Sequence, residues 1–173
     1  MNSISYLRVT QFSLLGLIAI ILPMAPVNLT PKLVPMPDLF FCFIMAWHLR
    51  DPKSSPLVLI IGLTLLMDIF NFRPIGLWPL LMIIISNLIY INRRLFFYSN
   101  IIKELLFFSL VFFSAMMCEF IFLFIMFLPT KSFSMYAQEV IITSLTYPFI
   151  ILFLHFFCRL KYNTSRLFFS EKL

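Results

Sequence analysis

Residues 56–72 form an apolar run that contains a single ionisable side chain, Asp68. A helix over this run is about 25 Å long, close to the thickness of the hydrocarbon core of a bilayer. A carboxylate inside such a helix costs roughly 3 kcal/mol on insertion scales, so we expect it to face other helices or a hydrated cavity. Asp68 is therefore a candidate functional residue. The alternative is a neutral carboxyl, hydrogen-bonded to a neighbouring helix, that serves only packing.

Composition indicates that the whole chain, and not only residues 56–72, belongs to a membrane protein. Of its 173 residues, 62% are apolar and 12% charged, with 23 phenylalanines, and the mean hydropathy is +1.02. This is more apolar material than a soluble core buries, so we predict an all-α polytopic membrane protein. A chain of this length leaves no room for a soluble catalytic domain beside its membrane segments.

The apolar segments and the prolines between them predict one transmembrane domain over residues 1–173. We expect about six spans, at residues 7–22, 37–49, 56–72, 77–91, 105–128 and 140–160. The first is read as an uncleaved helix, because no small-residue cleavage site follows it. Pro37 is expected to begin the second helix, with Asp38 in its first turn, where a carboxylate favours the N-terminus. Gln138 and Glu139 are assigned to a polar link before the sixth helix.

The second segment is short, with about 11 apolar residues against the roughly 20 that a perpendicular span prefers. Either the bilayer thins around it or it crosses only half of the membrane. Trp47 and the charged residues that follow it are typical of a membrane–water interface.

The distribution of lysine and arginine predicts the orientation of the six spans. With the N-terminus in the cytoplasm, ten cations lie inside, namely Arg8, Arg50, Lys53, Arg93, Arg94, Lys103, Arg159, Lys161, Arg166 and Lys172. Only Lys32, Arg73 and Lys131 lie outside. The positive-inside rule therefore predicts that both termini are cytoplasmic.

In this topology a second acid, Glu119, lies at a similar depth in the membrane to Asp68. Both lie in outward-running helices, about 18 Å (Asp68) and about 23 Å (Glu119) from the cytoplasmic ends, and so in the outer half of the membrane. We expect Asp68 to pair as an anion with Arg73, or to bond Ser86 and Asn87 of the next helix. A purely structural role is the alternative for both acids.

No sequence motif indicates catalysis or a cofactor. The chain has no P-loop, dinucleotide fingerprint or His-Glu-x-x-His motif, and neither His48 nor His155 has a neighbour at metal-ligand spacing. Its three cysteines lack the spacing of a zinc site or a disulfide framework. The net charge of +6 is explained by orientation and anionic lipid, so we predict no enzyme activity, no cofactor, no metal and no nucleic acid.

Three stretches occur in an order that resembles the bacterial rod shape-determining MreD family over the full length of the chain. They are 36–52 (MPDLFFCFIMAWHLRDP), 62–68 (GLTLLMD) and 73–77 (RPIGL). The spacing from Gly62 to Asp68 is longer than the Gly-Leu-x-x-Asp spacing of many members. The residues that carry the resemblance are Pro37, Asp38, Arg50, Pro52, Gly62, Asp68, Arg73, Pro74 and Gly76.

The resemblance implies a non-enzymatic subunit of the bacterial inner membrane that acts in side-wall peptidoglycan synthesis and rod shape. Its implied direct partner is MreC, and through MreC it is linked to MreB, RodA and a class B penicillin-binding protein. A homodimer is also allowed. The implied fold is similar to the substrate-binding subunits of energy-coupling-factor transporters. A small helical protein can act as such a scaffold by presenting helix faces in lipid.

Two other functions stay open. One is a vitamin- or metal-ion-binding subunit of an energy-coupling-factor type transporter, which would need several polar groups converging in an outer cavity. The other is a membrane structural protein of an unrelated kind.

Overall fold

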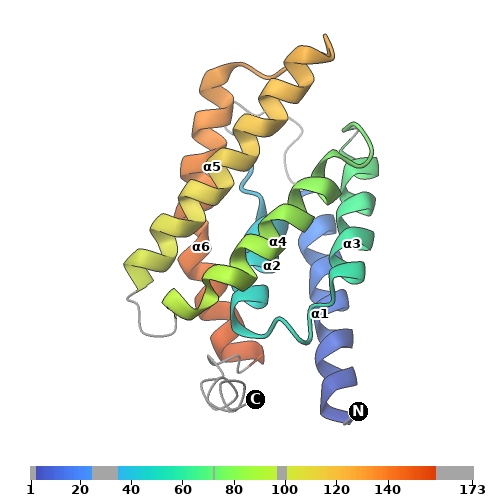
Figure 1. The fold of residues 1–173 in the computed structure, drawn as a ribbon, viewed down its shortest axis with the longest axis vertical. Coiled ribbons are helices and arrows are strands. Elements are labelled where there is room, and N and C mark those ends of the chain that lie inside the picture. The colour runs from blue at the N-terminus through green and yellow to red at the C-terminus, as the bar shows by residue number, and fades with distance from the viewer. Residues whose placement is uncertain (1–2, 25–34, 72, 97–100, 159–173) are drawn as a thin grey trace.

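The computed structural model describes residues 3–24, 35–71, 73–96 and 101–158 (Figure 1). Over these residues the chain forms six α-helices and one short 3-10 helix, without β-strands. The helices are α1 (Ser3–Ile21), α2 (Leu39–Arg50), α3 (Leu57–Phe70), α4 (Leu77–Phe96), α5 (Ile101–Ile125) and α6 (Phe133–Cys158), with η1 (Leu22–Met24) after α1. The predicted all-α class is confirmed.

Each predicted apolar segment overlaps one of the six helices, although α1 begins at Ser3 and α5 at Ile101, before the expected starts at 7 and 105. Two other starts differ for a reason that the contacts show. α2 begins after Asp38, because the Asp38 carboxylate accepts the Phe41 N–H at 2.9 Å and so caps the helix from outside. α6 begins at Phe133, so Gln138 and Glu139 belong to the helix and not to a link. Glu139 is buried there and paired with Lys131, which a solvated link would not provide.

α2 is the centre of the molecule. Every side chain from Phe40 to Arg50 is buried, and the helix contacts α1, α4 and α6. Its aromatic rings interlock with these neighbours, as in the contact of Phe41 with Trp78 of α4, whose ring centroids lie 6.1 Å apart. At 12 residues α2 is too short to cross a bilayer by itself. Since protein surrounds it, its polar ends do not have to meet lipid.

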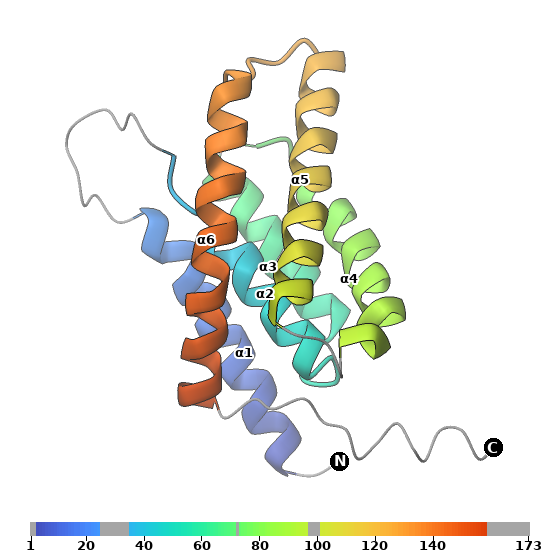
Figure 2. The same ribbon diagram turned by 90° about the vertical axis from the view of Figure 1, so that its left-hand side faces the viewer.

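Two helix pairs flank this centre. α5 and α6 run side by side and extend beyond the other helices at one end (Figures 1 and 2). On the other flank, α1 and α3 approach closely at Gly16, where an added Cβ would lie only 2.8 Å from Leu63 Cδ1. The beginning of α1 and the end of α6 lie at the same end of the molecule, opposite the turn between α3 and α4 (Figures 1 and 2).

Two helices, α5 and α6, are long and apolar enough to cross a membrane. Their outward side chains are large and apolar, as shown by Leu110 and Phe149, each 69% exposed, and Phe156, which is 80% exposed. Five charged side chains have the opposite distribution, whereas Lys53, Lys103 and Lys131 are exposed. Arg50, Asp68, Glu104, Glu119 and Glu139 are all buried. An apolar exterior around buried charges is unusual for a water-soluble protein and supports association with a membrane.

Candidate functional site

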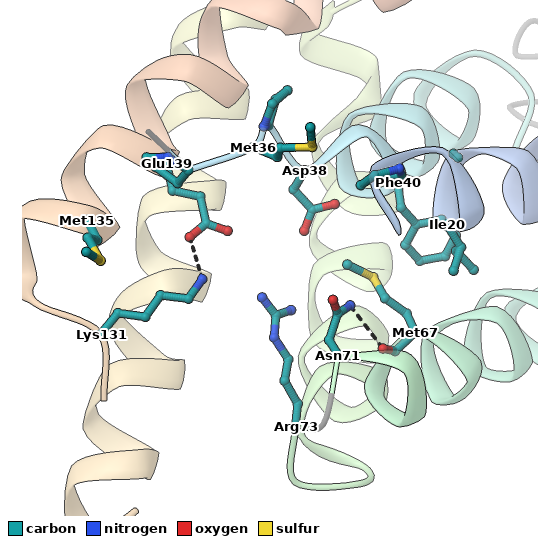
Figure 3. A pocket seen from close by; sticks show the side chains of 14 residues that line it. Ile20, Met36, Asp38, Phe40, Met67, Asn71, Arg73, Lys131, Met135 and Glu139 are labelled. Atoms are coloured by element: carbon teal, nitrogen blue, oxygen red, sulfur yellow. Dashed lines mark hydrogen bonds and ion pairs between the residues drawn. The ribbon is translucent and has the colours of Figure 1, made fainter. Parts of the chain in front are cut away.

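A cavity of about 500 Å³ lies at the end of the molecule where α3 turns into α4 and α5 connects to α6. Its polar lining comes from three segments that are far apart in sequence, and Figure 3 shows these side chains converging. They are Asp38, Asn71, Arg73, Lys131 and Glu139. Apolar side chains, including Ile20, Phe40 and Met67, complete the wall.

Asp38 enters the cavity because of its place before α2. Its Oδ1 atom caps the helix, and its backbone N–H donates to Thr143 Oγ1 of α6 at 3.1 Å. The residue is 7% exposed. Within the described part of the chain, the second carboxylate oxygen, Oδ2, has no hydrogen-bond partner. Pro37, which precedes Asp38, also lines the cavity.

Asp68 is fully buried, and its role differs from the predicted one. Its Oδ2 atom accepts the Gly76 N–H at 3.0 Å and so holds the turn between α3 and α4. Gly76 has a φ of +98°, which a side chain would strain. The predicted ion pair with Arg73 is wrong, and Ser86 Oγ has no partner among the described residues. The Arg73 N–H donates to the Asp68 carbonyl at 3.0 Å, but the Arg73 guanidinium forms its ion pair with Glu119 of α5.

Arg73 and Glu119 form the ion pair that sequence reasoning missed. Arg73 Nε lies 3.2 Å from Glu119 Oε1, and both side chains are largely buried. The guanidinium carbon lies 4.8 Å from the centroid of the Trp78 ring, a cation–π distance. Over the described residues, Arg73 Nη1 has no hydrogen-bond partner. The predicted second acid, Glu119, is therefore a neighbour of the cavity through Arg73.

Lys131 and Glu139 form a second ion pair, at 2.8 Å, in the same cavity. The Lys131 side chain is 46% exposed, whereas Glu139 is 7% exposed, so the pair lies at the edge of the cavity. Neither residue was a predicted site residue. The available signal was their spacing of eight residues around the start of α6, which alone does not identify a site.

The other candidates lie outside this cavity. Arg50 is at the opposite end of α2, where its Nη1 and Nη2 atoms contact Glu104 of α5 at 3.1 and 3.3 Å. Tyr147 of α6 donates to the same carboxylate at 2.7 Å. Pro52 lines a separate cavity of about 520 Å³ beside His48.

Two further candidates have little contact with either cavity. Gly62 lies in α3 with no heavy atom within 4 Å of an added Cβ, so no close packing there requires glycine. Pro74 is partly buried in the turn that Asp68 holds. Of the nine candidates that carry the family resemblance, Pro37, Asp38 and Arg73 line the first cavity, and Asp68 and Gly76 support it.

No protein-family model, curated protein or solved structure matches the chain. What the site can do therefore follows from its own groups. Two carboxylates and two cations line one cavity, an arrangement suited to binding a polar molecule through complementary charges. Within the described ranges, no three His, Cys, Asp or Glu side chains are grouped as a metal site would need.

Proposed function

We propose that the chain is a multi-pass protein of the bacterial inner membrane and a non-enzymatic scaffold of the side-wall peptidoglycan machinery, as its resemblance to the MreD family implies. The observation that carries the proposal is the convergence of the resembling stretches. Asp38 comes from the first, Asp68 from the second and Arg73 from the third, and together they build one end of the molecule. Residues from three separate stretches of the resemblance therefore contribute to the same part of the structure, the cavity end of the molecule.

The inverted distribution of polarity supports the membrane part of the proposal. Large apolar side chains cover the outside of the helices, and several charged ones are buried, for example Arg50 and Glu104, which pair with each other. In lipid, helices associate through packing and buried polar contacts, so a partner helix can dock on such an exterior. The proposed direct partner is the single-span protein MreC, which would connect the chain indirectly to MreB, RodA and a class B penicillin-binding protein.

The proposed topology has six spans and cytoplasmic termini. It would put the cavity with Arg73 and Lys131 outside, and the Arg50–Glu104 pair toward the cytoplasm. A reporter fused to the C-terminus should be active only in its cytoplasmic form. Activity of a periplasmic reporter at that position would exclude the six-span arrangement.

The scaffold function is tested by partnership and cell shape. Affinity purification from detergent should recover a single-span protein with a large periplasmic domain, and depletion should turn rod-shaped cells round. Depletion of a membrane protein that is unrelated to the cell wall serves as the control. Rod-shaped depleted cells, with no such protein recovered, would contradict the proposal.

The cavity itself favours a second candidate, the binding subunit of an energy-coupling-factor type transporter. Such a subunit needs polar groups that converge in an outer cavity, and the groups around Arg73 and Asp38 do converge. Loss of vitamin or metal-ion uptake in depleted cells that keep their shape would favour this function over the scaffold.

A further inference from the structure

Two buried polar atoms of opposite charge face the first cavity, and neither has a hydrogen-bond partner among the described residues. They are Asp38 Oδ2 and Arg73 Nη1. Asp38 is 7% exposed, and the Arg73 side chain is 13% exposed. Figure 3 shows the carboxylate and the guanidinium pointing toward each other across the cavity, and the described residues form no salt bridge between them. Buried polar atoms are normally hydrogen-bonded, so two unsatisfied ones that face the same cavity are available to bind a ligand there.

The charges around these two atoms restrict which chemical class of ligand the cavity can bind. Lys131 and Glu139 neutralise each other at 2.8 Å, and Arg73 is partly neutralised by Glu119 through its Nε atom. The lining as a whole holds two acids and two cations. A simple anion would be repelled by the carboxylates, and a simple cation by the ammonium and guanidinium groups. A molecule that carries both charges matches both ends of the cavity.

The remaining wall determines what else the ligand carries. Met36, Met67 and Met135, with Ile20 and Phe40, form an apolar surface beside the charged groups. Methionine side chains adapt to irregular apolar shapes. The volume of about 500 Å³ lies in the range of about 300–1,000 Å³ that small-molecule sites occupy.

We propose that this cavity binds a zwitterion with a primary ammonium group, an anionic group and an apolar portion. Arg73 Nη1 donates to the carboxylate or phosphate of the ligand, and the ammonium donates to Asp38 Oδ2. Free amino acids with apolar side chains and the headgroup of an ethanolamine phospholipid share this chemistry. The inference is independent of whether the chain is a scaffold or a transporter subunit, because it concerns the purified protein alone.

Binding to the purified full-length chain in detergent micelles tests the proposal. The probes are the apolar L-amino acids and short-chain phosphatidylethanolamine, measured by calorimetric titration and by thermal protection. The matched controls are the N-acetyl derivatives of the same amino acids, which keep the free carboxylate, and short-chain phosphatidylcholine, which keeps the phosphate; both lack ammonium N–H donors. We expect saturable binding of at least one probe, and binding of its control about tenfold weaker or worse, because a charge-assisted hydrogen bond is lost.

Asp38→Asn tests the assigned residue. Asparagine retains an oxygen that can cap α2, so the fold should persist while the negative charge is lost. Zwitterion binding should weaken about tenfold. Asp51→Asn, the same change in the partly exposed pair with Arg8 outside this cavity, should leave binding unchanged.

The possible results distinguish a soluble ligand from a lipid headgroup, and they also decide whether the proposal holds. Binding of amino acids alone identifies a soluble ligand, and binding of phosphatidylethanolamine alone identifies a lipid headgroup. The proposal is overturned if no probe binds saturably, if the controls bind as well as the probes, or if Asp38→Asn binds like the wild type. The comparison of probes with controls uses only the wild-type chain, so it tests zwitterion binding even if the Asp38→Asn variant fails to fold.

Discussion

Replacing Glu104 with glutamine should lower the free energy of unfolding by at least about 3 kcal/mol, because the buried Arg50 guanidinium loses the carboxylate that neutralises it. Both side chains are only 6% exposed, and their two N–O contacts are 3.1 and 3.3 Å. Tyr147 adds a 2.7 Å hydrogen bond to the same carboxylate. This cluster joins α2, α5 and α6, so its loss should loosen the centre of the molecule.

The double variant Arg50→Met/Glu104→Met distinguishes this mechanism from a simple loss of contacts. It removes both charges and keeps apolar volume, so it should recover most of the stability that Glu104→Gln loses. The reason is that the large cost of a single substitution is the cost of a buried charge left without its partner, and not the value of the pair itself.

The measurement is unfolding of the purified chain in mixed micelles with increasing SDS, followed by helical circular dichroism. Arg8→Gln is the control, because Arg8 also pairs with a carboxylate, that of Asp51 at 2.8 Å, but the Arg8 side chain is 43% exposed. It should change the unfolding free energy by less than about 1 kcal/mol. The reasoning is refuted if Glu104→Gln behaves like this control, or if the double variant is no more stable than Glu104→Gln.

Three further predictions concern the turn and the helix contacts. Asp68→Asn should unfold like the wild type, whereas Asp68→Leu should lose about 1–3 kcal/mol, because the buried Gly76 N–H keeps no acceptor; equal losses in the same SDS titration would contradict this. Gly76→Ala should destabilise by about 1 kcal/mol or more through its φ of +98°, whereas Gly62→Ala should be neutral or stabilising, and the reverse order would be evidence against the turn. Gly16→Val should force the Leu63 side chain, whose Cδ1 would lie 2.8 Å from the new Cβ, out of its packed position and lower the thermal midpoint, and an unchanged midpoint would contradict this close contact.

The helical segments were predictable because hydropathy is a local property. Six apolar runs between prolines and charges correspond to six helices in the structure. The starts were less predictable where a polar residue had a distant partner. Gln138 and Glu139 look like a link in the sequence, but α6 includes them because Glu139 is buried against Lys131.

The sequence by itself determined the apolar helical class and identified Asp68 and Glu119 as acids within apolar helices. Only the tertiary structure decided how those acids are used. Asp68 holds the Gly76 turn, Arg73 pairs with Glu119 of another helix, and Arg50 pairs with Glu104. The cost of burying a charge can be computed from one segment, but its partner is chosen by helix packing between segments far apart in the chain. For that reason the cavity between Asp38 and Arg73 could not be foreseen from the sequence.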